Sequence, residues 1–242
     1  MAAAVADFAV TFEPLGETTL LIRFGSRIDV QINAHVQEAT AILRSARLPG
    51  VVDLVPAYAS VALIYAPAAW ADGDGMPWQN LADAVGSVFS APPRHADVDG
   101  ALVHIPVCYD GENAPDLDRV ARIAGLDRAE VIALHTAPDY IVAMLGFAPG
   151  FPYLLGLDAA LHAPRRMDPR LRVPRGSVAI GGEQTGIYPR ELPGGWQLVG
   201  RTPLVLFDPW RATPCLLAAG DRVRFHAIAQ HAFDVLEKDR SA

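Results

Sequence analysis

The sequence predicts an α+β protein with two domains, a small α+β N-terminal domain followed by a β-barrel domain. The first part of the chain alternates strand patterns with helix patterns, whereas the part after residue 140 consists of short strand patterns separated by glycine and proline turns. A polar, proline-bearing stretch over residues 91–100 lies between them, so we place the domains at residues 1–92 and 93–242. A chain of 242 residues that is 51% hydrophobic can bury a core in each domain.

In the first domain, alternation of apolar and polar residues predicts strands, and apolar residues at helical spacing predict helices. The first helix should stop where Pro49 and Gly50 follow it, because these residues do not continue a helix. This order of elements predicts helices packed on one face of a sheet. The predicted elements are strands over 8–12 and 19–24, a helix over 29–47, strands over 51–57 and 61–65, and a helix over 78–89.

The second domain should begin with a strand and two short helices. Pro115 at the first helical position and Gly125 just past the end frame the first helix. Asp127 and Glu130 form a capping box for the second. The many short strands that follow predict a closed or nearly closed barrel. The predicted elements are a strand over 101–107, helices over 115–124 and 128–135, short strands from 140, a strand over 221–228 and a helix to Lys238.

The composition excludes several classes of function. A net charge of −7 and a pI near 5.4 argue against nonspecific nucleic-acid binding, which requires a basic surface. Lys238 is the only lysine, so a Walker lysine, a Schiff-base lysine and a biotinyl lysine are all excluded at internal positions. Cys108 and Cys215 show no CxxC spacing and suit buried thiols of a cytoplasmic protein.

No membrane segment, targeting segment or metal site is expected. The start of the chain has no basic, apolar signal-peptide pattern. Residues 51–70 approach the length of a membrane span, but Asp53, Pro56 and Pro67 interrupt them and their β-branched content favours strands. The histidines show no metal-ligand spacing, and no Ser-His-Asp or Cys-His order is present.

Residues 146–209 are the segment in which we expect the function. They contain ten glycines, nine prolines and seven arginines, with aromatic and aliphatic residues between them. So many special backbone angles within a segment that still carries core residues predict tight turns around a buried site. Arginine binds carboxylates and phosphates through two donors at once, so the ligand should be an anion.

The glycine-rich turn is the first candidate site. Gly181, Gly182 and Gly186 offer backbone N–H groups, and Glu183 and Thr185 add a carboxylate and a hydroxyl. Such a turn can bind an anion. The alternative is a tight hairpin whose glycines are needed for positive φ angles.

Further candidates lie at strand ends and in the aromatic loop. Arg190 and Arg201 sit beside turns, where a guanidinium can reach a cleft; the alternative is a surface salt bridge. Residues 146–153 form a rigid aromatic loop, either a pocket wall with Tyr153 in contact with substrate or a core-filling segment. Gln197 is a further substrate contact, and His104 is either catalytic or structural.

Long motifs resemble one family. The motifs are GFAPGFPYLLGLD, PRRMDPRLRVPRGSVAIGGEQTGIYPRELPGGWQLVGRTPL and HIPVCYDGENAPDLDRVA. Over nearly its whole length the chain is similar to the B subunit of 5-oxoprolinase, also called KipI or allophanate hydrolase subunit 1. The resemblance implies that the barrel is cyclophilin-like. It also implies two protein partners, a KipA-like C subunit and a LamB/YcsF-like A subunit, and a small-molecule substrate.

The resemblance further implies a reaction, ATP-dependent opening of 5-oxo-L-proline to L-glutamate with Mg²⁺, by a protein that is active only within its complex. In that reaction Glu183, Arg201 and His104 would be catalytic, with Glu183 as base or magnesium-water ligand. Thr185, the glycine turn and Arg190 would hold phosphates. Arg175 stands where an alanine is more usual in the family, so it is not expected in the site.

Three alternatives accompany this reaction. The family also includes a carboxyltransferase subunit of urea-carboxylase systems and an inhibitor of a histidine kinase. Prolyl isomerisation follows only from analogy with other cyclophilin-like barrels, and a fold alone does not specify a function.

Overall fold

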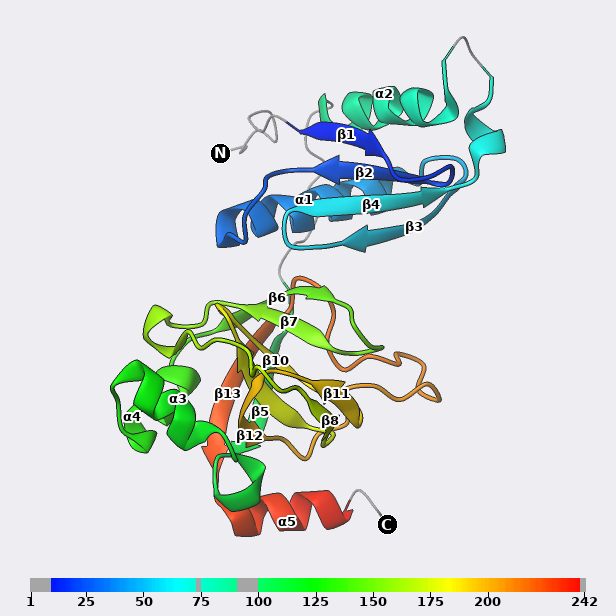
Figure 1. Cartoon of the computed structure of the whole chain (residues 1–242). Coiled ribbons are helices and arrows are strands. Elements are labelled where there is room, and N and C mark those ends of the chain that lie inside the picture. Colours follow the sequence, from blue (N-terminus) through cyan, green and yellow to red (C-terminus); the bar gives the residue numbers. More distant parts are fainter. Residues whose placement is uncertain (1–9, 73–74, 91–99, 240–242) are drawn as a thin grey trace, which may run out of the picture. The chain divides into compact units, whose positions relative to one another are not determined.

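The computed structural model describes residues 10–72, 75–90 and 100–239 (Figure 1). The chain divides into two compact units, Met1–Asp99 and Gly100–Ala242. The boundary that we predict between residues 92 and 93 lies outside the described residues. The predicted fold class is confirmed, because the chain combines helices with a closed seven-stranded barrel.

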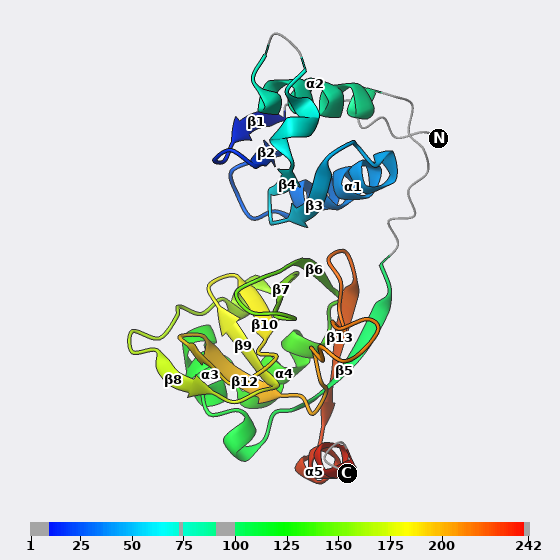
Figure 2. The same ribbon diagram turned by 90° about the vertical axis from the view of Figure 1, so that its right-hand side faces the viewer.

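The first unit is a four-stranded antiparallel sheet with two helices, α1 (Val30–Ala46) and α2 (Pro77–Ser90). Both helices pack on the same face of the sheet, as predicted (Figure 2). The strands, in sheet order, are β1 (Thr11–Pro14), β2 (Thr19–Arg23), β4 (Ser60–Tyr65) and β3 (Val51–Pro56).

Strand alternation explains which face the helices cover. In β2 the side chains of Leu20 and Ile22 are fully buried, and in β4 those of Val61 and Leu63 are as well. Their neighbours along each strand are only partly buried, because successive side chains point to opposite faces. The stretch over residues 51–70 forms the two strands β3 and β4 and then the short 3₁₀ helix η1 (Pro67–Trp70). None of the described helices is long and apolar enough to cross a membrane.

Two local predictions for this unit need comment. Asp29 caps α1, accepting hydrogen bonds from the backbone N–H groups of Gln31 and Ile32, so the predicted start of this helix is confirmed. The first strand, predicted over 8–12, ends two residues later, at Pro14, and is described from Thr11 onward; residues 8 and 9 are outside the described ranges.

The second unit is built on the closed barrel. Its last strand pairs in parallel with its first over seven residues, from Arg222 with Leu102 to Ile228 with Cys108. This pairing joins the two ends of the unit, so the barrel closes on itself and its strand edges are satisfied. The strands, in barrel order, are β10 (Gln184–Ile187), β7 (Pro152–Leu155), β6 (Tyr140–Leu145), β13 (Arg222–Ile228), β5 (Leu102–Cys108), β12 (Gln197–Arg201) and β9 (Ser177–Gly181).

Two helices, α3 (Leu117–Ala124) and α4 (Arg128–Thr136), pack against the barrel strands β12 and β13. The capping box of Asp127 and Glu130 is confirmed, and Gly125 ends α3 with φ +69°. The prediction that Pro115 opens α3 is wrong, because the helix starts two residues later. Asp116 occupies the capping position, but its carboxylate binds arginines instead of the helix N-terminus.

The unit also contains a small sheet, two one-turn 3₁₀ helices, one of them η3 (Ala159–Leu161), and a last helix. The strands β8 (Arg170–Val173) and β11 (Leu192–Gly194) form a two-stranded sheet. This sheet contributes to an apolar cluster, separate from the barrel core, that includes Phe151, Tyr188 and Trp196. The turn η2 (Gly111–Asn113) follows β5, and the helix α5 (Gln230–Asp239) follows β13.

Candidate functional site

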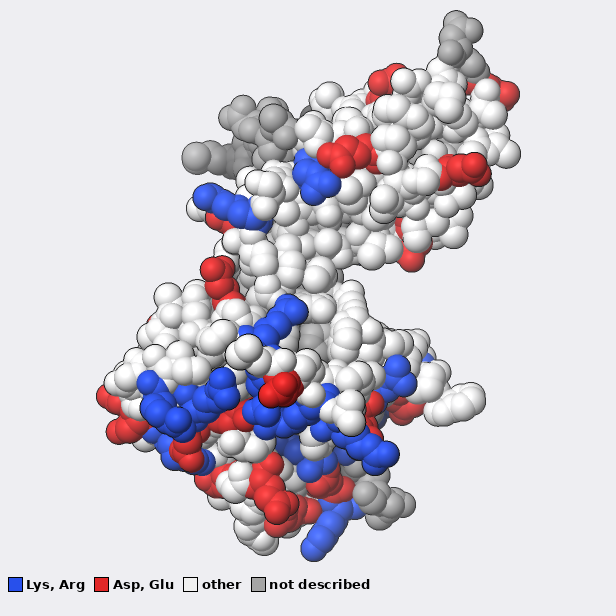
Figure 3. Space-filling view, in the orientation of Figure 1, with Lys and Arg blue, Asp and Glu red and all other residues white. Residues whose placement is uncertain are grey.

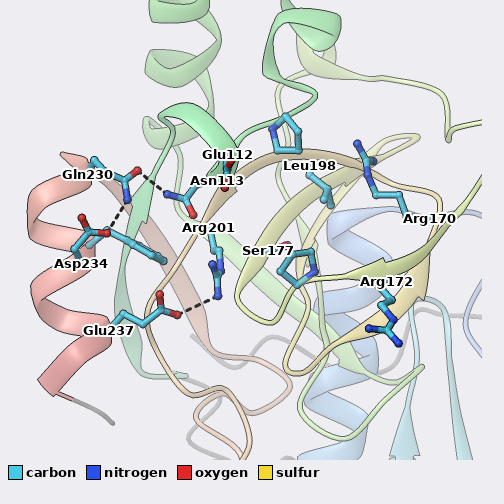
Figure 4. Close-up of a pocket in the computed structure, with 13 residues that line it drawn as sticks. Glu112, Asn113, Arg170, Arg172, Ser177, Leu198, Arg201, Gln230, Asp234 and Glu237 are labelled. Atoms are coloured by element: carbon cyan, nitrogen blue, oxygen red, sulfur yellow. Dashed lines mark hydrogen bonds and ion pairs between the residues drawn. The ribbon is translucent and has the colours of Figure 1, made fainter. Parts of the chain in front are cut away.

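A pocket of about 630 Å³ opens between α5, η2 and the strands β8, β9 and β12 (Figure 4). This volume is in the range of small-molecule sites. Among the predicted site residues, only Arg201 lines it. The lining residues are Glu112, Asn113, Pro115, Arg170, Arg172, Pro174, Ser177, Leu198, Arg201, Gln230, Phe233, Asp234 and Glu237.

Arg201 is held in a fixed orientation. Its Nε donates to the backbone oxygen of Arg175 at 2.9 Å, and its guanidinium lies over the ring of Phe233, 5.4 Å from the ring centre. Its Nη2 donates to Glu237 Oε1 at 3.0 Å, and Arg175 Nη2 donates to the same oxygen at 3.3 Å. Two arginines therefore meet one carboxylate oxygen at the wall of the pocket.

Amide side chains connect η2 with α5 across the pocket. Asn113 Nδ2 donates to Gln230 Oε1 at 2.8 Å, and Gln230 Nε2 donates to Asp234 Oδ1 at 2.8 Å (Figure 4). Phe233 is the buried apolar anchor of α5, with 2% exposure. The helix thus contributes polar groups to the pocket while one aromatic ring holds it in the barrel unit.

Arg170, on the opposite wall, is bound to a buried acid. Asp116 accepts both Nη groups of Arg170 at 2.7 and 2.8 Å, Nη1 of Arg166 at 3.2 Å and the backbone N–H of Leu198 at 2.8 Å. The Asp116 side chain is 5% exposed. This carboxylate fixes β8 and the segment before it to β12, and so it shapes the pocket wall.

The charges of the pocket are separated by element. The basic side chains, Arg170, Arg172 and Arg201, come from β8 and β12, and the acidic ones come from η2 and α5. Figure 3 shows arginines and acids interspersed over the visible face of the barrel unit. The pocket therefore presents a basic wall and an acidic wall, an arrangement that suits a ligand with both an acidic group and N–H donors.

The aromatic loop forms a packed cluster outside the pocket. Phe147 has φ +67° and sits in a γ-turn, in which Ala148 N donates to Gly146 O at 2.7 Å. A turn with positive φ at a bulky residue is rare and strained. Phe147 is 61% exposed and meets Phe151 and Tyr188 edge-on, at ring-centre distances of 5.5 and 6.4 Å.

Tyr153 belongs to the same cluster. Its ring lies 5.9 Å from that of Trp196 in an edge-on contact, and partial burial raises the pKa of the Tyr153 phenol. Arg165 also packs on this cluster, 5.8 Å from the Trp196 ring centre.

The glycine-rich turn is tightly packed. A side chain at Gly181 would collide with Trp196, and one at Gly186 would collide with the backbone oxygen of Pro152 and press on Phe151. Gly182 has φ +67°, and its N–H donates to Ala163 O at 2.8 Å. The turn is thus a hairpin in which one glycine supplies the positive φ and two allow close packing.

Thr185 lies inside the barrel, fully buried, in a hydrogen-bonded chain. Its hydroxyl donates to Ala179 O at 3.0 Å, so it accepts from His135 Nε2 at 3.2 Å. His135 Nδ1 in turn accepts from the hydroxyl of Tyr109 at 2.8 Å. Burial lowers the pKa of His135 to about 3, so this histidine is neutral.

Gln197 is also fully buried. Its Nε2 donates to Pro164 O at 2.7 Å, whereas its Oε1 has no hydrogen-bond partner among the described residues. The amide is therefore half satisfied, and it is not among the residues that line the pocket.

The remaining predicted residues lie on the surface. Glu183 and Arg190 are exposed in turns next to β10, and His104 is exposed on β5 with its ring centre 6.4 Å from that of His226. The structure does not bring these residues together with Arg201, since none of them lines the pocket.

Known proteins are similar in sequence to both compact units of this chain. Residues 10–217 match the family described as carboxyltransferase domain, subdomain C and D. The B subunit of 5-oxoprolinase from Bacillus subtilis (strain 168) is 41% identical over 231 residues, which cover 94% of this chain and 96% of that protein. The chain belongs to the 5-oxoprolinase B-subunit family.

Solved structures are also similar to this member of the 5-oxoprolinase B-subunit family. The crystal structure of TTHA0988 is 40% identical, with a TM-score of 0.74 over 87% of this chain, and the chain spans only 40% of that larger chain. The Kluyveromyces lactis urea carboxylase has a TM-score of 0.72 over 95% of this chain, which spans 23% of it. At 22% identity, that likeness shows the fold alone.

Sequence reasoning on this 5-oxoprolinase B-subunit family member missed most of the pocket. The predicted helix after Pro115 includes Asp116 without a role for it, and Glu237 lies in a terminal helix with no motif. The available signal was the run of arginines over 165–175, which needs acidic partners when it is partly buried. Which acids those would be depends on contacts between residues 50 to 62 positions apart.

Proposed function

We propose that the chain is the B subunit of an ATP-dependent 5-oxoprolinase, which opens 5-oxo-L-proline to L-glutamate. The observation that carries the proposal is the 41% identity to the Bacillus subtilis protein over 94% of this chain. A match of this extent includes both compact units, so it goes beyond a shared barrel. The proposed partners are a KipA-like C subunit and a LamB/YcsF-like A subunit in the cytoplasm.

Opening a lactam requires activation of an amide. Phosphorylation of the amide oxygen makes the carbon more electrophilic and provides a leaving group, after which the protein must hold the substrate carboxylate and position a base. In this proposal the pocket beside α5 is the small-molecule site that this chain contributes. Arg201 is its anion-binding residue, because it is fixed in orientation and lines the pocket.

ATP and Mg²⁺ belong to the assembled enzyme in this proposal. The Gly182 N–H and the Thr185 hydroxyl, expected at the phosphates, are bonded to Ala163 and Ala179 within the chain. The turn therefore does not fit a phosphate group. Across the described residues, no group of three or more His, Cys, Asp or Glu side chains could hold a metal ion. We place the nucleotide on the partner proteins or where they meet this chain.

The proposal is tested by measuring ATP hydrolysis that depends on 5-oxoproline, with detection of glutamate. The chain is assayed alone and mixed with its KipA-like and LamB/YcsF-like partners. We expect glutamate only in the full mixture. An assembled mixture of folded subunits that produces no glutamate would exclude this function.

Substitution of Arg201 tests the role of the pocket. Arg201→Ala should lower turnover of the assembled enzyme by at least roughly tenfold, because a charge-assisted hydrogen bond to the substrate carboxylate is lost. Arg222→Ala is the matched control, since Arg222 is an exposed arginine that does not line the pocket. Equal rates for the wild type and Arg201→Ala would remove Arg201 from the site.

The family description favours a second candidate, carboxyl transfer to a urea-like amide, because the matched family is that of a carboxyltransferase domain. This reaction needs a biotin carrier and a carboxylase supplied by other chains. It is tested by adding carboxybiotin and urea to the same assembled subunits and following loss of carboxybiotin. Glutamate formation without urea-dependent loss of carboxybiotin would decide for the first candidate.

A further inference from the structure

We infer that Arg201 and Arg175 form a binding site for the carboxylate of a small acid, and that Glu237 of α5 occupies this site from within the chain. The inference rests on the proposed function for the choice of ligand and deepens it, because it concerns what controls binding to this chain alone. In the structure Glu237 Oε1 stands in for one carboxylate oxygen of the ligand.

Bonds within the chain fix the positions from which Arg201 and Arg175 extend before any ligand binds. Arg201 is oriented by its bond to Arg175 O and by the ring of Phe233. The backbone that carries Arg175 is also fixed: Gly176 N donates to Tyr188 O at 2.7 Å and Gly176 O accepts from Thr202 N at 2.9 Å. The guanidinium of Arg201 therefore loses little freedom on binding a carboxylate, and that of Arg175 extends from a fixed backbone.

The internal carboxylate is replaceable. Glu237 lies near the end of α5, and its side chain is 29% exposed. Rotation of this side chain into solvent would free the site while Phe233 stays buried, so α5 need not leave the barrel. Partly exposed ion pairs of this kind contribute little to stability, because water screens the charges.

The rest of the pocket indicates the class of ligand. Arg201 and Glu237 both line the cavity of about 630 Å³, so a ligand in the cavity reaches Arg201 directly and meets Arg175 by taking the place of the Glu237 oxygen that both arginines share. Beside them are Asp234 and the amides of Asn113 and Gln230. Asp234 would repel a second carboxylate and would accept a hydrogen bond from an N–H group. The site therefore suits a small carboxylic acid that also carries N–H donors, such as an amino acid or a lactam acid.

Competition between Glu237 and the ligand sets the apparent affinity. A site that is filled from within most of the time binds its ligand more weakly, in proportion to the fraction of time it is open. If Glu237 fills it about nine-tenths of the time, its removal should strengthen binding roughly tenfold. The contact of Glu237 with the two arginines would then keep ligand occupancy of the pocket low until the ligand concentration is high.

The test measures binding of 5-oxo-L-proline to the full chain by NMR titration. The carboxamide of the same lactam, which lacks the carboxylate, is the control ligand. Glu237→Gln should strengthen binding of the acid roughly tenfold and leave the carboxamide unchanged. Asp118→Asn is the control variant: it also removes one negative charge that pairs with an arginine, but Asp118 does not line the pocket, so the affinity should be unchanged. Adding Arg201→Met to Glu237→Gln should abolish the gain.

Three results would overturn the inference. These are an unchanged affinity in Glu237→Gln, an equal gain for the carboxamide, and a gain that survives Arg201→Met. If Glu237→Gln does not fold, Glu237→Asp provides the same test, because the shorter side chain withdraws the carboxylate. Binding by the chain alone and turnover by the assembled enzyme are separate measurements, so failure of one is distinguishable from failure of the other.

Discussion

Among the carboxylates of the barrel unit that bind two arginines, Asp116 and Glu237 do so in different ways. Asp116 is 5% exposed and accepts four hydrogen bonds, one of them from a backbone N–H. Glu237 is 29% exposed and meets its arginines through one oxygen. The first is enclosed between β8, α3 and β12, whereas the second comes from a helix with one buried anchor.

The difference separates a structural ion pair from one that a ligand can replace. A buried carboxylate cannot leave its arginines without leaving them unpaired in a region of low dielectric constant. A partly exposed carboxylate at a pocket wall is replaced by water or by another anion at little cost. The same residue types therefore shape the pocket at one wall and bind ligand at the other.

Asp116→Asn should have the largest effect on stability. Removal of this charge leaves Arg166 and Arg170 without their partner, and we expect a loss of about 4 kcal/mol in the free energy of unfolding. Urea unfolding measures the loss. Asp118→Asn is the control, since Asp118 is 68% exposed and pairs with the exposed Arg128; it should cost less than about 1 kcal/mol. Equal losses in the two variants would contradict the structural role of Asp116.

Gly176→Ala tests the backbone that carries Arg175. The new methyl group would collide with the carbonyl oxygen of Thr202, and φ is +79° at this position. Overpacking and backbone strain together should cost about 3 kcal/mol. Gly182→Ala has a similar φ, +67°, but open space around it, so it should cost only about 1 kcal/mol. Thermal unfolding of both variants separates the collision from the strain.

Lowering the pH should reduce the free energy of unfolding of the barrel unit, because its interior contains the buried His135. The pKa of His135 is about 3 in the folded state, below its unfolded value of about 6.5. The unfolded state therefore binds the proton first, and stability that is complete above pH 6.5 falls as the pH decreases toward 3. The expected loss is about 2 kcal/mol between pH 6.5 and 5.

Urea midpoints from pH 7.5 to 5 measure this loss, in a range where most carboxylates stay ionised. His135→Gln should flatten the pH dependence, whereas substitution of the exposed His104 should not change it. A wild-type protein whose stability is constant over this range would contradict the buried, neutral state of His135.

Glu237→Gln should have the smallest effect on stability. Because the pair is partly exposed, we expect a change of less than about 1 kcal/mol in urea unfolding. A loss as large as that of Asp116→Asn would show that both carboxylates are structural, and the comparison between them would fail.

Much of the fold was predictable because it depends on local patterns. Alternation in β2 and β4, the helical spacing of α1 and the capping box of Asp127 and Glu130 are each set within a few residues. The start of α3 could not be predicted from a local pattern, because Asp116 binds arginines 50 and 54 residues away instead of capping its helix.

The candidate site was less predictable than the fold. Arg201 lies in the pocket as an anion-binding residue should, but the similar Arg190 is exposed outside it. Thr185 was predicted to bind phosphate because it follows a glycine-rich turn, but its hydroxyl donates to the backbone oxygen of Ala179 inside the barrel. These outcomes depend on the direction in which each strand or turn places its side chains.

The two-domain α+β architecture, the barrel and the family could be predicted from the amino-acid sequence. Hydrophobic spacing, turn residues and long motifs are each formed by residues that are close together in the chain. Which acid meets which arginine was decided by the closed barrel and the position of α5. These pairings join residues that are distant in sequence, and burial determines whether a pair is permanent or replaceable. Residue type alone cannot give burial, since it arises only when the strands and α5 are packed together.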